Sequence, residues 1–200
     1  MPQLLIPLEP EKVYHIWTHA NGSENLFRNE ENYRYFLEKY TQHIYPIAKT
    51  YAYCLMPNHL HLMVEVREEK ELLNLRGFEN PGGLIKISQK FGNLFNAYTK
   101  AYNQMYDRKG SLFIPKFRRK LIDNDSYFTR LIAYIHNNPI HHQFVRNLND
   151  WSHSSYHSYL LNKPTKSERE SGMSWFGGKD EFIKIHKELQ PKDVILEFEQ

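Results

Sequence analysis

Cysteine is nearly absent from this 200-residue chain, and long apolar runs are missing altogether. Because Cys54 is the only cysteine, the chain can form no internal disulfide and no zinc site built from several thiolates. No apolar run approaches the ~18 residues that a membrane-spanning helix needs. The N-terminus also lacks a basic segment followed by an apolar one. These absences predict a soluble, cytoplasmic protein with no membrane partner.

Excess charge of one sign is also scarce, because 26 Lys and Arg residues nearly balance 23 Asp and Glu residues. A formal net charge of only +3 is a weak argument for a nucleic-acid partner. The distribution says more, since basic residues clearly outnumber acidic ones between Lys100 and Arg130. A hydrophobic share of 40%, with 14 Tyr and 12 Phe, predicts a folded core beside this basic middle region.

Apolar periodicity and turn residues predict the order of secondary structure. Strands are expected at residues 13–19, 47–56 and 59–66, an extended segment at 112–122, and helices at 29–45, 84–106 and 125–137. Pro57-Asn58 is too short for a parallel crossover, so the second and third strands should form an antiparallel hairpin. Pro139 is expected to end the last helix at Asn137. The order predicts an α+β fold with helices packed on one face of an antiparallel sheet.

Two parts of the chain differ in character. Residues 1–160 contain every predicted strand and are interpreted as one catalytic domain. Beyond Tyr159 the chain becomes polar, and Lys163-Pro164 with residues 168–172 is typical of a linker. A small helix is expected at 179–189. Residues 161–200 are therefore predicted to be a linker followed by a short appendage that is helical in part.

The triplet His59-Leu60-His61 is the first candidate site. Residues at positions i and i+2 of a strand project from the same face, so the two imidazoles should point the same way while Leu60 enters the core. Two imidazoles one pleat apart can chelate a divalent cation. The alternative is that they are surface or stacking histidines, as in most such triplets. Their place in an apolar run directly after a turn strengthens the case for a metal site.

Tyr134 and Asn138 form the second candidate site. At about 100° per residue they lie together on the flank of the apolar face of the predicted helix, on the border between core and solvent. Tyr134 could present its hydroxyl to a substrate there, and Asn138 could add a carbonyl oxygen to a metal held by two histidines. On spacing alone, the favoured explanation is an ordinary boundary tyrosine and a helix-capping asparagine.

The third candidate is the basic segment 113–120, with sequence FIPKFRRK. If it is extended, Lys116, Arg118 and Lys120 share one face, and Phe117 and Arg119 the other. Cations that neutralise phosphates, beside aromatic rings that stack on unpaired bases, suit single-stranded nucleic acid. We therefore expect Lys116, Arg118, Arg119 and Lys120 to contact DNA, against the alternative of a solvated edge strand protected by its charge.

Taken together, these segments resemble the REP-associated tyrosine transposases, relatives of the one-tyrosine HUH transposases of bacterial insertion sequences. The most specific stretch is 53–61 (YCLMPNHLH), which carries the HUH motif. Five blocks match in order and cover about residues 13–160: 14–22 (YHIWTHANG), 53–61, 110–118 (GSLF and KFR), 134–139 (YIHNNP) and 151–156 (WSHSSY). The chain departs from the family at His19, where Arg is frequent, and at Ile114, where Gln is found.

The resemblance implies a ferredoxin-like sheet and a set of residue roles. By position, His59 and His61 become metal ligands, Asn138 the third ligand and Tyr134 the nucleophile. Mg²⁺ or Mn²⁺ is the implied metal, and hairpin-forming single-stranded DNA is the implied substrate. The implied activity is that of a metal-dependent endonuclease and strand transferase that forms a 5′-phosphotyrosine intermediate.

Two other function classes compete with this interpretation. One is a non-catalytic or regulatory module that stacks single-stranded nucleic acid on the exposed aromatics of a similar sheet. The other is a zinc hydrolase built on the His-x-His pair, although no carboxylate partner lies beside that pair in the sequence. A monomer and a homodimer, with Tyr134 acting in its own subunit or in the other, are both compatible with the sequence.

Overall fold

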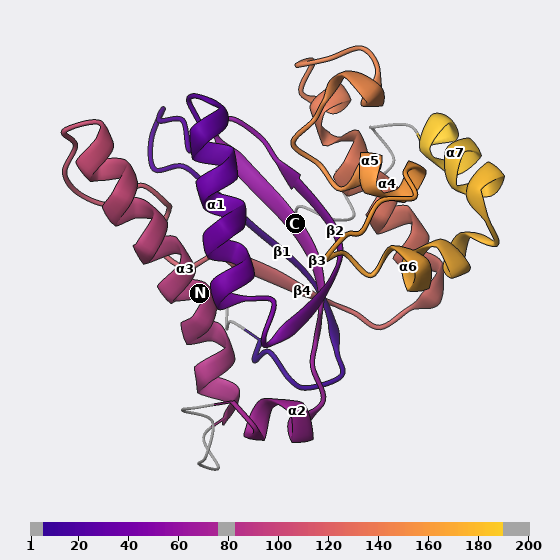
Figure 1. The fold of residues 1–200 in the computed structure, drawn as a ribbon, viewed down its shortest axis with the longest axis horizontal. Coiled ribbons are helices and arrows are strands. Elements are labelled where there is room, and N and C mark those ends of the chain that lie inside the picture. The colour runs from indigo at the N-terminus through magenta and orange to yellow at the C-terminus, as the bar shows by residue number, and fades with distance from the viewer. Residues whose placement is uncertain (1–5, 76–82, 190–200) are drawn as a thin grey trace.

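The computed structural model describes residues 6–75 and 83–189 (Figure 1). Its elements are β1 (Val13–His19), α1 (Glu30–His43), β2 (Ala48–Leu55), β3 (His59–Val66), α2 (Glu69–Leu73), α3 (Gly83–Met105), β4 (Arg118–Ile122), α4 (Asp125–His141), the 3₁₀ helix η1 (Leu148–Asp150), α5 (Tyr156–Leu160), α6 (Arg169–Phe176) and α7 (Lys179–Glu188). The predicted strands at 13–19 and 59–66 are confirmed with their bounds. In the predicted extended segment 112–122, only the last part is a strand.

The four strands form one antiparallel sheet in the order β2-β3-β1-β4. The expected hairpin of β2 and β3 is confirmed. Together with α1 and α3, the chain order is β1-α1-β2-β3-α3-β4, which is the ferredoxin-like βαββαβ arrangement. The predicted α+β class is therefore confirmed, and β1 and β3 lie side by side in the middle of the sheet.

Helix α1 begins where the sequence signals a cap. The Asn29 side chain accepts a hydrogen bond from the Asn32 backbone N–H at 3.1 Å. Glu30 and Glu31 occupy the first turn, where negative charge complements the helix dipole. Helix α3 begins at Gly83 and runs to Met105, close to the predicted helix at 84–106.

One face of the sheet packs against α1 and α3. Ile16 of β1 and Leu62 of β3 lie in a single buried cluster with Phe36 of α1 and Phe91 of α3. The alternation of apolar residues along β1 and β3 therefore places them where the sequence predicts, in the core beneath these two helices. Burial of this face supplies the main hydrophobic stabilisation of the ferredoxin-like unit.

The opposite face is covered by α4, which corrects the expectation that the helices lie on one face. Met63 and Cys54 of the sheet share a second buried cluster with Leu131 and Ile135 of α4. Figure 1 shows α1 and α3 on one side of the sheet and α4 to α7 gathered on the other. The βαββαβ pattern places only its own two helices, and α4 lies outside that pattern.

Helix α4 also continues through Pro139, where the sequence predicts an end at Asn137. Every residue from 131 to 139 is buried. The side-chain amides of Asn137 and Asn138 each donate a hydrogen bond to the carbonyl four residues earlier, at 2.9 and 3.0 Å. Burial of this long apolar segment outweighs the single helical hydrogen bond that proline cannot donate.

Helices α6 and α7, within residues 169–188, pack onto α4. The predicted helix at 179–189 is confirmed as α7, whereas residues 169–172, expected in a linker, belong to α6. Phe176 and Phe182 lie in the same buried cluster as the apolar face of α4. No helix in the described part of the chain is long and apolar enough to span a membrane.

Candidate active site

Histidines line the sheet face that α4 covers. In the β1–β3 pairing, His19 lies opposite His59, and Trp17 lies opposite His61. Directly opposed residues of antiparallel strands share a face, so His15, Trp17 and His19 of β1 join His59 and His61. The predicted common face of His59 and His61 is thus present, and it lies beneath α4.

The two imidazoles of the His-x-His pair are close to each other. Their ring centroids are 5.2 Å apart with planes at 88°. His59 Nδ1 hydrogen-bonds Asn58 Oδ1 at 2.8 Å, and His61 Nδ1 hydrogen-bonds His15 Nε2 at 3.0 Å. In both ligand candidates the Nδ1 atom is already engaged, which leaves Nε2 as the nitrogen for a metal.

Burial keeps these histidines uncharged. The pKa of His59 is lowered to about 3, mainly by burial; His142 and His19 act in the same direction, and the interaction with Asn138 opposes them. Burial also holds the pKa of His61 well below its usual value, with His15 and His59 acting in the same direction. Neutral imidazole is the form that ligates a metal, so protons compete little with a cation here at neutral pH.

Helix α4 brings Tyr134 and Asn138 to this face. The Tyr134 ring lies edge-on to His61, with centroids 5.7 Å apart, and edge-on to His15 at 6.1 Å. Asn138, one turn later, donates to the Tyr134 carbonyl at 3.0 Å. The structure therefore brings together the four residues that the sequence proposes as ligands and nucleophile.

Tyr134 is only 1% exposed, which corrects the expectation of a tyrosine on the border between core and solvent. The reason is that α4 lies flat on the sheet, so its flank as well as its apolar stripe is covered. A tyrosine that attacks DNA from this position must become accessible first.

Two polar atoms at this face fit a cation. Within the described part of the chain, the buried His59 Nε2 and Asn138 Oδ1 atoms make no hydrogen bond of full geometric quality, although the Asn138 side chain lies close enough to His59 to raise its pKa. An orphaned buried lone pair is costly and is commonly explained by an ion or water. No group of three His, Cys, Asp or Glu side chains able to hold a metal occurs among the described residues. A complete site would therefore need the Asn138 oxygen and oxygens from substrate or water.

Sequence reasoning missed several neighbours of the pair. His19 stacks on His59 with centroids 4.9 Å apart, and His142 approaches the same ring at 4.6 Å. His141 lies 5.7 Å from the Tyr134 ring, and burial lowers its pKa to about 4. His19 could have been found from the period-2 spacing of β1. His141 and His142 could not, because Pro139 predicts a helix end before them.

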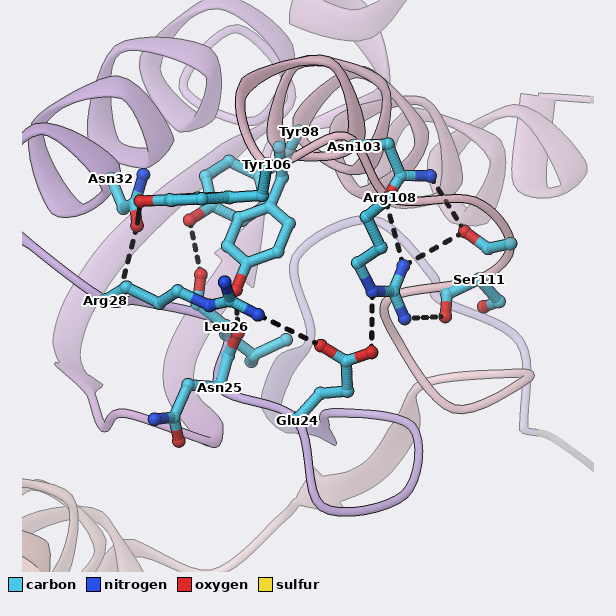
Figure 2. A network of polar contacts seen from close by, with 12 residues as sticks. Glu24, Asn25, Leu26, Arg28, Asn32, Tyr98, Asn103, Tyr106, Arg108 and Ser111 are labelled. Carbon is cyan, nitrogen blue, oxygen red and sulfur yellow. Dashed lines mark hydrogen bonds and ion pairs between the residues drawn. The ribbon is translucent and has the colours of Figure 1, made fainter.

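The turn that carries Asn58 is held from the opposite side of the molecule. Leu26 N–H and Phe27 N–H both donate to the Pro57 carbonyl, at 2.6 and 3.1 Å. The loop containing them is anchored on α3, as Figure 2 shows. Tyr98 donates to the Leu26 carbonyl at 2.5 Å, and Arg108 pairs with Glu24 at 2.6 Å. The position of His59 therefore depends on a turn that the apolar side of the protein stabilises.

The basic segment divides between the two faces. Arg118 lies opposite Trp17 and Lys120 opposite His15 in the β1–β4 pairing, so both share the histidine-bearing face. Arg119 projects to the other face, where it stacks on Phe117 at 4.4 Å and donates to Ser88 at 2.5 Å. Lys116 is exposed before β4 and has a left-handed backbone with φ of 64°. Arg118 and Lys120 are thus placed beside the site, and Arg119 is not.

Comparisons with known proteins match the resemblance found in the sequence. No protein-family model matches the chain. The chain is 28% identical over 119 residues to a Haemophilus influenzae protein named "Putative REP-associated tyrosine transposase". That match covers 60% of this chain and 64% of the relative's length. A solved structure of a REP-associated tyrosine transposase bound to a REP hairpin superposes with a TM-score of 0.63 at 17% identity, covering 82% of this chain and 89% of that one. The predicted resemblance is confirmed, and the structural likeness confirms the fold.

Proposed function

We propose that this protein is a metal-dependent, single-strand DNA endonuclease and strand transferase that acts on hairpin-containing DNA through Tyr134. One observation carries the proposal: His59 and His61 lie side by side beneath α4, and the Tyr134 ring lies edge-on to His61, with Asn138 one helical turn later. Among the described residues, the buried His59 Nε2 and Asn138 Oδ1 atoms make no hydrogen bond of full geometric quality. The similarity to a transposase and to a hairpin-bound relative supports the same class of reaction.

Tyr134 would attack the scissile phosphorus with its phenol oxygen. A new Tyr–O–P bond forms, the P–O3′ bond breaks, and the departing 3′ oxygen takes up a proton, which leaves a 5′-phosphotyrosine and a free 3′-OH. Mg²⁺ or Mn²⁺ bound by His59, His61 and Asn138 would polarise the phosphate and offset its developing charge. Since the covalent bond conserves the energy of the broken phosphodiester, a second 3′-OH can reverse the step and join a new strand.

The burial of Tyr134 adds a requirement to this proposal. A phenol that is 1% exposed cannot reach a phosphate, so DNA binding must rotate the side chain or displace part of α4. The segment at the C-terminal end of α4 is the natural place for such an opening. His142 is exposed and contacts His59, so it lies between solvent and the proposed site.

The DNA path would follow the β4 edge. Arg118 and Lys120 lie on the same face as His15 and Trp17, with Lys116 exposed just before them. Phosphates held along this edge would lead a single strand toward His61, which lies opposite Trp17 on β3.

The test is recovery of a covalent adduct. Purified protein is incubated with Mn²⁺ and a 5′-labelled single-stranded hairpin oligonucleotide, and peptides are then analysed by mass spectrometry. We expect a nucleotide on the peptide containing Tyr134, and loss of both adduct and cleavage in Tyr134→Phe. The matched control is Tyr127→Phe on the same helix, which should cleave normally. Binding without any adduct in the wild-type protein would favour the non-catalytic nucleic-acid-binding alternative.

A further inference from the structure

In the two proposed metal ligands, His59 and His61, different hydrogen-bond partners of Nδ1 would fix the same tautomer. For His59 the tautomer is clear, because an amide oxygen can only accept. Asn58 Oδ1, at 2.8 Å, therefore requires a proton on His59 Nδ1. A metal-ligating imidazole is neutral, so with its proton on Nδ1 the His59 ring carries its lone pair on Nε2. The Asn58 side chain thus presets His59 for coordination through Nε2.

The Nδ1 atom of His61 is paired with a second imidazole, that of His15. His15 Nε2 lies 3.0 Å from His61 Nδ1, and the two ring planes are within 16° of each other. Nearly parallel planes suit a hydrogen bond that lies in both rings along a nitrogen lone pair. One proton lies between the two nitrogens, so either ring could be the donor.

The two arrangements have opposite consequences for His61. If His15 donates, the remaining His61 proton lies on Nε2, and no lone pair is left to bind a cation. If His61 donates, its Nε2 is free of a proton and matches His59. The proton position in a single hydrogen bond therefore decides whether the His-x-His pair can act as a chelate.

We propose that His15 is a positioning residue that accepts the Nδ1 proton of His61 and so holds His61 in the tautomer that presents Nε2 to the metal. This inference rests on the proposed function for its purpose, and it assigns a role to a β1 histidine outside the His-x-His pair. His15 would not touch the metal or the DNA.

The surroundings of His15 suit a fixed acceptor. The ring is completely buried and stacks on Trp17 with centroids 4.6 Å apart and planes at 22°. The Tyr134 ring lies edge-on to His15, with centroids 6.1 Å apart. A ring held between Trp17, His61 and Tyr134 cannot swing away without disturbing this packing, so its Nε2 stays aimed at His61.

The direct test is the tautomer itself, measured in the metal-free full chain by ¹⁵N-histidine NMR. Long-range ¹H–¹⁵N spectra distinguish a protonated from an unprotonated ring nitrogen. We expect the proton of His61 on Nδ1 and that of His15 also on Nδ1. A proton on His61 Nε2 in the wild-type protein overturns the inference, whatever the protein does with DNA.

A matched pair of variants then tests the consequence for metal binding. His15→Gln keeps an acceptor oxygen near the former Nε2, whereas His15→Met fills similar space with a poor acceptor. We expect His15→Met to weaken Mn²⁺ binding about 10- to 100-fold, while His15→Gln stays near wild type. Ile16→Val, on the opposite face of β1, controls for a general loss of stability.

The outcomes separate this inference from the proposed function. Equal losses in His15→Met and His15→Gln would overturn the positioning role while leaving the metal site intact. Wild-type protein that binds no Mn²⁺ would contradict the proposed function. In that case the NMR measurement on the metal-free chain still decides for or against His15 as the acceptor of the His61 proton.

Discussion

The two faces of the sheet are formed by the same strands, but one carries apolar side chains and the other carries buried polar ones. Along β3, Leu60 and Leu62 enter the core beneath α1 and α3, while His59 and His61 point toward α4. The first face contributes to a hydrophobic core. Within this core, Tyr98 and Tyr102 donate hydrogen bonds to the carbonyls of Leu26 and Asn25. The second carries buried imidazoles and amides, which cost free energy to desolvate. A protein retains such a face when its polar atoms serve a purpose beyond stability.

Not every buried histidine on the α4 side belongs to the proposed site. His186 Nδ1 must donate to the Phe182 carbonyl at 2.7 Å, so its Nε2 accepts from His136 Nδ1 at 2.9 Å. His136 Nε2 then accepts from the Ser155 hydroxyl at 2.7 Å. Here every nitrogen is satisfied, which marks a structural network that joins α7 to α4. In the candidate site, by contrast, the buried His59 Nε2 makes no hydrogen bond of full geometric quality.

Substitutions on the two faces of β3 should give the largest contrast. His61→Ala removes a proposed ligand, and loss of several kcal/mol of transition-state stabilisation lowers the cleavage rate by about 10³-fold or more. Leu62→Ala on the other face should cost about 2–5 kcal/mol of unfolding free energy. We expect cleavage to survive Leu62→Ala below its melting temperature. Urea unfolding and a Mn²⁺-dependent cleavage assay measure both effects, and a His61→Ala protein that still cleaves would contradict the metal site.

Acid should destabilise the α4 side. Burial lowers the pKa of His186 to about 4 and holds that of His136 well below its usual value. The unfolded state binds protons near pH 6.5 and the folded state does not. Stability is therefore full above pH 6.5 and falls as pH drops toward 4, by up to about 1.4 kcal/mol per pH unit for each histidine.

Urea unfolding at pH 7.5, 6 and 5 checks this slope. His186→Leu should be less stable than wild type at pH 7.5 but lose less stability on acidification. Tyr98→Phe, on the α1–α3 side, keeps every histidine and serves as the control with a wild-type slope. Parallel pH profiles for wild type and His186→Leu would show that the His136–His186 pair is not responsible.

The basic segment should show a smaller but selective contrast. Removing Lys116, Arg118 and Lys120 together should flatten the plot of log affinity against log salt by roughly 2 units, at about 0.7 per phosphate of a single strand. Arg119→Gln removes one positive charge of the same segment on the opposite face and should leave the slope unchanged. Fluorescence anisotropy with a labelled single strand measures both. A slope change in Arg119→Gln equal to one third of that in the triple variant would place the DNA elsewhere.

The smallest effect on cleavage is expected for Tyr98→Phe, on the α1–α3 side of the sheet. Tyr98→Phe removes the hydrogen bond to the Leu26 carbonyl and should cost about 1–2 kcal/mol of unfolding free energy. Its cleavage rate should stay within a few-fold of wild type, in contrast to the complete loss expected for Tyr134→Phe. A large loss of cleavage in stable Tyr98→Phe protein would show that the loop in Figure 2 acts directly on the reaction.

Local patterns in the sequence determined much of this protein. The period-2 alternation of β1 and β3 set which residues share a face, and Pro57-Asn58 set the hairpin. Asn29 set the start of α1. The His-x-His triplet and the Tyr134–Asn138 spacing brought the candidate residues to attention. Each of these depends on neighbours a few residues apart, which a sequence displays directly.

Only the tertiary structure decided how the faces are used. It placed α4 on the second face and carried that helix through Pro139, because burial of a whole helix face outweighs one hydrogen bond. The same packing buried Tyr134 and brought His15 within 3.0 Å of His61, across 46 residues of sequence. Strand order decides such contacts, and strand order depends on the packing of the entire chain.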